Sequence, residues 1–530
     1  MGNLLWWHTG VIYQVYPRSF MDSDGDGVGD LNGVRQRLDY LQDLGVTGIW
    51  LSPVNPSPMV DFGYDISDYR AIHPLFGTMK DFDRLLKEVH RRGMKLITDL
   101  VPNHTSEAHP WFLESRSSRA NPKRDWYLWY DPAPGGGPPN NWLSAFGGSG
   151  WEWDEATGQY YFHSYLKEQP DLNWRNPAVQ EEMHDIMRFW LDRGVDGFRV
   201  DVMWHLIKDE RLRDNPPNPD YKPGMSPYFR YRPNYSVDQP EVHGIVAAMR
   251  KILDGYPERV LIGEIYLPVK SLVSYYGRNN DEAHLPFNFQ LITLPWDAAS
   301  IGAAVDQYEG ALPEGAWPNW VLGNHDRSRI ASRVGIRQAK IAALLLLTLR
   351  GTPTLYYGDE LGMTDVVIPP SKVQDPHEKN IPGLGLGRDP ERTPMLWNAE
   401  KNAGFTTGTP WLPVGRTYRR INAGVQATDD TSMLCFYKRL IRLRNAQPAL
   451  HSGSFRRLDT EGTALVYVRR QGNARWLIAL NLGTRRTTVR LADPALRATV
   501  VLGTHSDAEG KQLTHRFRLR GSEGMVARLH

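Results

Sequence analysis

Acidic side chains stand at the ends of several apolar, β-rich segments, where burying an unpaired charge is costly and needs a reason. An arginine lies two residues before one of these acids, and a histidine directly precedes another. Carboxylates on separate strands, without redox, phosphate-binding or metal-protease motifs, are typical of glycosyl transfer, in which one carboxylate attacks the anomeric carbon and a second moves the proton. The residues concerned are Asp99, Arg199, Asp201, Glu264, His325 and Asp326.

Eight short β-rich runs, separated by segments with apolar residues at helical spacing, would have to position these acids. Because strands and helices alternate, we predict a (β/α)8 TIM barrel, an α/β fold whose catalytic residues gather at the C-terminal ends of the strands. An open doubly wound sheet is the alternative, but no GxGxxG motif follows the first strand. The predicted strands are 10–20, 47–53, 95–101, 196–202, 259–265, 285–291, 317–325 and 352–358.

Two long segments interrupt this alternation, and a third part follows it. Residues 104–174 are rich in Pro, Gly, Asn and Trp, and at about 70 residues they exceed an ordinary loop, so we predict an inserted subdomain after the third strand. Residues 362–430 form a second long excursion before the last barrel helix. Short strands over 453–530 predict a C-terminal β-sandwich domain. The barrel itself is then expected over 1–103 and 175–452.

The composition excludes several classes of protein. Lys plus Arg is 62 and Asp plus Glu is 60 in 530 residues, so the net charge of +2 gives no reason to expect nucleic acid as a partner. The single cysteine, Cys435, excludes an intrachain disulfide, and with no signal-peptide pattern this favours a cytoplasmic protein. The longest apolar run, 341–349, is about half a membrane span and predicts a buried helix, not a membrane contact. The 18 Trp and 24 Tyr would suit sugar stacking, although most are expected in the core.

An acidic loop follows the first predicted strand. Carboxylates and one carbonyl recur there at alternate positions, and Gly27 permits a tight turn, which is the spacing of oxygen ligands for a hard cation. The loop is not an EF-hand, because Gly33 stands where the bidentate Glu would be. A structural cation and a solvated acidic loop are the alternatives, and no organic cofactor is expected. The candidate ligands are Asp22, Asp24, Asp26, the Val28 carbonyl and Asp30.

Five motifs follow the order of a known family: VIYQVYPRSF, DLVPNHTS at 99–106, GFRVDV at 197–202, GEIYLP at 263–268 and NHD at 324–326. On these motifs the sequence resembles glycoside hydrolase family 13, the α-amylase family, over essentially the whole chain. QPDLNW at 169–174 is similar to a motif of the oligo-1,6-glucosidase group. The resemblance implies a retaining exo-acting α-glucosidase, with a structural Ca²⁺ or Mg²⁺ ion in the acidic loop.

The resemblance also implies roles for the acids. Asp201 would be the nucleophile, with Arg199 holding its carboxylate ionised and oriented. Glu264 would be the acid/base, which requires a raised pKa. Asp326 would bind the 2- and 3-hydroxyls of the distorted sugar and so favour the transition state.

Further side chains would surround the non-reducing glucose if the resemblance holds. They include groups that contact its hydroxyls, a charged wall at its far edge that enforces exo-action, and an aromatic platform beneath it. In this order they are His104, His325 and Gln169; Asp61 and Arg388; and Tyr64. Tyr165 stands where the group usually has a Phe, and Arg392 would lie near the +1 subsite, which binds the leaving group.

Val202, directly after the implied nucleophile, resembles the residue of α-1,6-preferring members, since a smaller or polar residue is commoner in α-1,4 enzymes. Short α-glucosides of the isomaltose type are therefore favoured as substrate, while maltose, sucrose and trehalose stay open, as does the oligomeric state. A transglucosylase or sucrose-converting enzyme of the same fold is the alternative, although the Arg- and Asp-rich loop of isomaltulose-forming relatives is not recognised here. A non-catalytic relative is disfavoured because the three acids are present.

Overall fold

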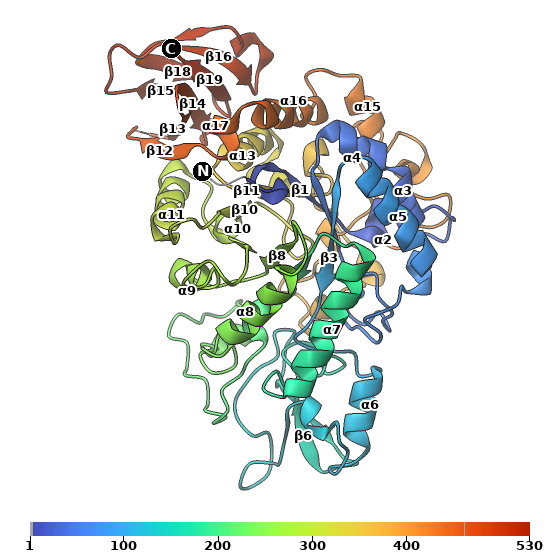
Figure 1. The fold of residues 1–530 in the computed structure, drawn as a ribbon. Coiled ribbons are helices and arrows are strands. Elements are labelled where there is room, and N and C mark those ends of the chain that lie inside the picture. Colours follow the sequence, from blue (N-terminus) through green and yellow to red (C-terminus); the bar gives the residue numbers. More distant parts are fainter. Residues whose placement is uncertain (1–3, 461) are drawn as a thin grey trace.

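Eight parallel strands form a barrel at the centre of the molecule (Figure 1). The computed structural model describes residues 4–530 apart from residue 461. The strand order is β10-β11-β1-β2-β3-β7-β8-β9, and a parallel bridge between Asn288 and Trp320 joins the two edges. Each strand lies within a predicted run, so the predicted (β/α)8 barrel is confirmed. The strands are β1 (Ile12–Val15), β2 (Gly48–Leu51), β3 (Lys95–Leu100), β7 (Gly197–Val200), β8 (Val260–Gly263), β9 (Leu285–Pro286), β10 (Asn319–Val321) and β11 (Thr352–Tyr356).

Helices between the strands cover the outside of the barrel, and α5 (Met79–Arg91) shows why the sequence forms them. Thr78 caps its first turn and exchanges hydrogen bonds with Asp81. Its buried residues recur every three or four positions, namely Phe82, Leu85, Leu86 and Val89. The other long helices are α3 (Leu31–Gln36), α4 (Leu38–Leu44), α7 (Pro177–Arg193), α8 (Val242–Leu253), α9 (Val269–Ser274), α11 (Ala298–Ala311), α13 (Ile336–Thr348) and α16 (Met433–Ala446).

Short helices occupy the connections: α1 (Trp6–Thr9), α2 (Pro17–Phe20), α10 (Gln290–Thr293), α12 (Ile330–Val334) and α17 (Pro448–His451). The predicted buried helix over 341–349 is the C-terminal part of α13, which is buried on all sides between the barrel and the C-terminal strands. Within the described residues, no helix is long and apolar enough to cross a membrane.

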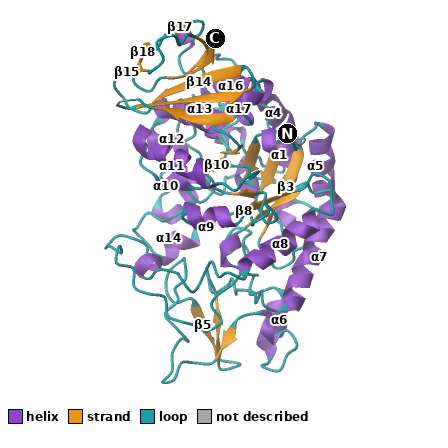
Figure 2. Cartoon of the chain, turned by 60° about the vertical axis from the view of Figure 1, so that its left-hand side comes forward, coloured by secondary structure: helices purple, strands orange, loops and turns teal. Residues whose placement is uncertain are grey.

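The segment 104–174 projects from the barrel after β3, at the end opposite the C-terminal strands (Figures 1 and 2). It contains a small antiparallel sheet of β4 (Trp129–Tyr130), β6 (Gln159–Phe162) and β5 (Trp151–Asp154), and a helix, α6 (Pro110–Ser117). The sequence pattern predicts no helix here. Pro110 in the first turn and a hydrogen bond from Trp111 N to the His109 ring nevertheless start one.

The excursion 362–430 lies against this projecting segment. It carries α14 (Pro376–Asn380) and α15 (Ala423–Ala427). The Phe146 ring lies 4.8 Å from the His377 ring, so α14 and the projecting segment meet near the C-terminal ends of the barrel strands. Segments 104–174 and 362–430 can therefore both contribute side chains to a binding site at this end of the barrel.

The C-terminal part is all-β and packs on α13. One sheet contains β12 (Ser454–Leu458), β13 (Ala464–Gln471), β14 (Ala474–Asn481), β19 (Gly524–Leu529), β16 (Ala498–Gly503) and β17 (Gln512–Leu513). A second pairs β15 (Thr487–Arg490) with β18 (Arg516–Leu519), and an apolar core lies between the two sheets. The predicted C-terminal all-β domain is confirmed.

Candidate active site

Two acids stand next to each other because their strands are neighbours. Val200 of β7 is paired with Gly263 of β8, so the residues that follow, Asp201 and Glu264, lie side by side at the strand ends. The fully buried Arg199 guanidinium joins them, with Nη1 2.7 Å from Asp201 Oδ1 and Nη2 2.6 Å from Glu264 Oε2. Two carboxylates on one guanidinium are close neighbours: Asp201 is fixed by a charge-assisted hydrogen bond from Nη1, and Glu264 by its ion pair with Nη2.

A third buried carboxylate, Asp99 of β3, completes the surroundings of this guanidinium. Its Oδ1 accepts a bond from Arg199 Nη1 at 2.9 Å, and its Oδ2 accepts bonds from Tyr64 Oη at 3.0 Å and Trp50 Nε1 at 3.1 Å. Burial raises the pKa of Asp99 to about 6, although Arg199 opposes the rise. Sequence reasoning noticed Asp99 at a strand end but gave it no role. Its hydrogen bonds show that it anchors both Arg199 and Tyr64.

The pair of carboxyl groups shares a proton-binding equilibrium. Burial raises the pKa of Asp201 and that of Glu264, and Arg199 offsets this rise in part. The charge of Glu264 raises the pKa of Asp201 further. Because neighbouring carboxylates oppose a second ionisation, the pair keeps one proton where ordinary carboxyl groups have lost theirs. One carboxylate and one carboxylic acid are the forms that a nucleophile and a general acid need.

The backbone after Asp201 takes a strained turn. Val202 has φ 38° and ψ 47°, in the left-handed region, where a β-branched residue is a genuine outlier. The turn directs the backbone N–H of Val202 at Glu264, whose Oε2 accepts it at 3.0 Å. Backbone strain of this kind gathers at functional sites, where the surrounding structure holds it.

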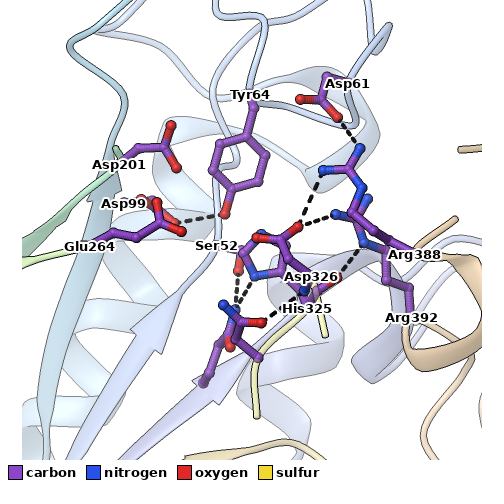
Figure 3. Close-up of polar contacts among 12 residues, drawn as sticks. Ser52, Asp61, Tyr64, Asp99, Asp201, Glu264, His325, Asp326, Arg388 and Arg392 are labelled. Carbon is purple, nitrogen blue, oxygen red and sulfur yellow. Dashed lines mark hydrogen bonds and ion pairs between the residues drawn. The ribbon is translucent and has the colours of Figure 1, made fainter. Parts of the chain in front are cut away.

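Asp326 is held from several sides after β10 (Figure 3). Arg392 Nη2 lies 2.7 Å and Arg388 Nη1 3.2 Å from its Oδ1. Gln14 Nε2 donates to His325 Nδ1 at 2.8 Å, which leaves the proton of this ring on Nε2, 3.4 Å from Asp326 Oδ2. Although burial alone would raise the pKa of Asp326, these neighbours hold it well below its usual range. Asp326 is therefore ionised, with about a quarter of its side chain exposed (24%).

Arg392 is fully buried and also donates from Nε to the His325 carbonyl at 2.7 Å. Its contacts support a role in holding Asp326, in place of the contact with the +1 subsite that the sequence led us to expect. Sequence reasoning missed Gln14 altogether, because a polar residue inside the apolar strand β1 carries no motif that ties it to His325.

Asp61 and Arg388 form the expected charged pair, with Arg388 Nη2 2.7 Å from Asp61 Oδ1. Burial raises the pKa of Asp61 to about 6 in spite of Arg388. Gln169 Nε2 donates to Asp61 Oδ2 at 3.3 Å, so the projecting segment contacts this pair. In Figure 3 the Tyr64 ring lies between Asp201 and Glu264 on one side and the arginines on the other.

The aromatic and histidine positions are more tightly engaged than expected. The Tyr64 ring stacks on His325, with centroids 5.2 Å apart and an interplanar angle of 4°. His104 bonds to the Tyr64 carbonyl through Nε2 at 3.0 Å and to Asn103 Nδ2 through Nδ1 at 3.1 Å, so both ring nitrogens have protein partners. The Tyr165 ring lies 5.5 Å from His104 and 5.4 Å from Phe146. The structure thus brings every expected sugar-binding side chain to one end of the barrel.

Comparisons with known proteins agree with this geometry. The α-amylase catalytic domain family matches residues 14–453, which include both carboxylates, Asp326 and the two arginines. The chain belongs to the α-amylase family. The family resemblance inferred from the motifs is confirmed, and with it the assignment of the chain as a glycoside hydrolase.

Relatives in this family are similar over nearly their whole length. A probable α-glucosidase of Rhizobium meliloti is 41% identical over 92% of this chain and 91% of its own. The oligo-1,6-glucosidase of Parageobacillus thermoglucosidasius is 39% identical over 99% of both. Among solved structures, an α-glucosyl transfer enzyme superposes with a TM-score of 0.94 at 41% identity, covering 99% of this chain and 100% of its own. A mutant isomaltulose synthase of Erwinia rhapontici NX5, bound to sucrose, gives 0.91 at 35% identity, with 100% of both chains covered.

The acidic loop of this α-amylase family member brings three of its four acids together. Ligand atoms of Asp22, Asp24 and Asp30 lie within 4.8 Å of one another, whereas Asp26 is not part of this group. Asp22 already accepts backbone N–H bonds from Gly25 at 2.7 Å and Gly27 at 2.9 Å, which shape the turn. The loop therefore offers clustered carboxylate oxygens, the donor type that Ca²⁺ and Mg²⁺ prefer.

Proposed function

We propose that this enzyme is a retaining, exo-acting α-glucosidase that hydrolyses short α-glucosides. The observation that carries the proposal is the pair Asp201 and Glu264 on a single Arg199 guanidinium. Because both carboxyl groups contact the same guanidinium, they lie close together, as the nucleophile and acid/base of a retaining glycosidase do, whereas inverting enzymes hold a water in a wider gap.

In this mechanism Asp201 attacks the anomeric carbon while Glu264 gives its proton to the leaving glycosidic oxygen, forming a β-glucosyl-enzyme. Glu264, now a carboxylate, removes a proton from the incoming water, which attacks the anomeric carbon and releases Asp201 with net retention. Asp326, ionised and fixed by two arginines, would accept bonds from the 2- and 3-hydroxyls. Those bonds strengthen as the ring flattens, which favours the transition state.

The ion pair between Asp61 and Arg388 supports exo-action. This charged, buried pair lies on the far side of Tyr64 and would close the site at the non-reducing end of a bound glucose ring. A longer sugar chain could not extend beyond the pair. Val202 and the α-1,6-specific naming of one relative favour isomaltose-type linkages. However, the contact of one side chain is worth only about 1–3 kcal/mol in linkage choice. A panel of kcat/KM values on isomaltose, maltose, sucrose, trehalose and p-nitrophenyl α-glucoside tests the substrate class. Activity on none of them would refute the proposal.

A second candidate, a transglucosylase or sucrose-converting enzyme, is favoured by the similar solved structures, which include an α-glucosyl transfer enzyme and an isomaltulose synthase. In that reaction a sugar or alcohol replaces water at the same glucosyl-enzyme. Timed product analysis on sucrose and maltose separates the two. Early, dominant isomers or oligosaccharides at modest substrate concentration support transfer, and free glucose supports hydrolysis.

We also propose that the acidic loop holds a structural cation, Ca²⁺ or Mg²⁺. Asp22, Asp24 and Asp30 would hold it, and the clustered carboxylates fit such an ion because the charges would otherwise repel one another. In this proposal the ion would contribute stability and no catalytic step. The Asp26 carboxylate, outside the cluster, would remain in solvent.

A further inference from the structure

Arg388 is held by a carboxylate with no place among the sugar-binding groups. Asp375 stands at the start of α14, in the excursion that the sequence could not position, and its side chain is fully buried. Its Oδ2 accepts the backbone N–H of Arg388 at 2.6 Å and Nε at 3.0 Å, while its Oδ1 accepts Nη2 at 2.7 Å. This is a fork of bonds along one edge of the guanidinium, the geometry that orients an arginine most firmly.

The other edge of the guanidinium faces the site. Arg388 Nη1 reaches Asp326 Oδ1 at 3.2 Å, and Nη2 reaches Asp61 Oδ1 at 2.7 Å. The Phe146 ring centroid lies 4.8 Å from the guanidinium carbon, so movement in that direction is blocked as well. Arg388 is thus clamped between a carboxylate behind it and two carboxylates in front of it.

The charge of Asp375 explains why this carboxylate is needed to orient Arg388. Without Asp375, the long Arg388 side chain would be oriented by Asp61 and Asp326 alone, the two acids that the proposed function assigns to substrate. A sugar hydroxyl that binds Asp61, Asp326 or Arg388 would then compete with the contacts that hold Arg388 in place. Burial alone would raise the pKa of Asp375, but Arg388 holds it well below the usual range, so the clamp carries its charge.

We propose that Asp375 is a positioning residue that fixes Arg388 for a hydrogen bond to the hydroxyl at C4 of the non-reducing glucose. C4 lies opposite the anomeric carbon, so its hydroxyl is the one that faces the far side of the site. The inference rests on the proposed function. It gives α14 and the Asp375–Arg388 fork a part in recognising the non-reducing end of the substrate.

A neighbouring carboxylate provides the matched control. Asp389 is also buried, and its Oδ2 accepts the backbone N–H groups of Gln374 at 2.6 Å and Asp375 at 3.0 Å. Asp389→Asn therefore loosens the same stretch of chain without removing the fork on the Arg388 side chain. Asp375→Asn removes the charge of the fork with little change of shape.

The experiment measures kcat/KM for wild type, Asp375→Asn and Asp389→Asn on p-nitrophenyl α-glucoside and on its 4-deoxy analogue. Wild type should prefer the parent substrate by about 10- to 100-fold, the usual worth of a hydrogen bond to a charged group. Asp375→Asn should lose most of that preference, because the parent substrate falls and the 4-deoxy analogue hardly changes. Asp389→Asn should change both substrates by the same factor.

Equal losses on both substrates in Asp375→Asn would overturn the inference, and so would a wild type that does not distinguish the two substrates. A wild type inactive on the parent glucoside would instead refute the proposed function. Should Asp375→Asn not fold, as judged by thermal melting, Asp375→Glu keeps the charge and displaces it. The same selective loss, smaller in size, supports the inference, and an undiminished preference contradicts it.

Discussion

Arg199 offers the clearest test of the electrostatics at the site, because one buried cation serves three buried acids. Its Nη1 lies 2.7 Å from Asp201, and its Nη2 lies 2.6 Å from Glu264. For charge centres about 4 Å apart at an effective dielectric constant of about 20, the attraction is about 4 kcal/mol, or about 3 pKa units. Arg199→Gln should therefore raise the pKa of Asp201 by about 1–3 units, the range seen for carboxylates that lose such a partner.

The sign of the effect follows from the chemistry. Asp201 must be ionised to attack, so the acidic limb of kcat/KM reports its loss of a proton in the free enzyme. Removing the Arg199 guanidinium favours the protonated form of Asp201. As the pH falls, activity should therefore disappear at a higher pH than in wild type. Arg199→Lys keeps the charge but not the fork, so its limb should move less.

The assay is kcat/KM against pH on p-nitrophenyl α-glucoside, with thermal melting recorded for each variant. Arg444→Gln is the matched control. Arg444 is also fully buried, and its described hydrogen bonds go to backbone carbonyls, including that of Leu450 at 3.1 Å. It should lower the melting temperature and leave the acidic limb in place. An Arg199→Gln variant whose limb coincides with that of wild type would refute the reasoning.

Three further predictions concern the acids, the linkage and the ion. Asp201→Asn and Glu264→Gln should each lower kcat on isomaltose by about 10³-fold or more at unchanged melting temperature. The loss of kcat in Glu264→Gln should be smaller on p-nitrophenyl α-glucoside, because its leaving group needs no proton. Near-normal kcat in either would mean that the site is elsewhere. Val202→Thr should lower the ratio of kcat/KM on isomaltose to that on maltose, by about 10-fold or more if the side chain decides linkage, and an unchanged ratio would show that it does not. Chelation of divalent cations should lower the melting temperature of the wild type, and added Ca²⁺ should restore it. In Asp22→Asn neither treatment should change the melting temperature. A wild type whose melting temperature responds to neither chelator nor Ca²⁺ would indicate a solvated loop without an ion.

The sequence was sufficient for the barrel and for the residues at its strand ends. Strand-like runs and helical spacing alternate regularly, and a barrel places strand ends together whatever the loops do. Asp201 and Glu264 could therefore be predicted to share one end of the barrel from the sequence alone, and the pairing of Val200 with Gly263 makes them direct neighbours. The motif context then supplied roles that spacing alone could not.

The sequence did not reveal the contacts that hold these residues in place. Asp375 lies 13 positions before Arg388, in a stretch without helical or strand period, so no pattern pairs them. Gln14 reaches His325 across 311 positions, from β1 to the end of β10, and β11 lies between these two strands in the sheet. Val202 is a residue type that avoids the left-handed region, and only the packing around Asp201 and Glu264 places it there.

The central claim, that Asp201 and Glu264 act as the nucleophile and acid/base of a retaining enzyme, is tested most directly by the anomer released first. Proton NMR during hydrolysis of p-nitrophenyl α-glucoside, read before mutarotation, should show α-glucose appearing first, with β-glucose following only as the anomers equilibrate. β-Glucose as the first product would require inversion by a single displacement, and it would contradict the covalent mechanism built on the carboxylates that share Arg199.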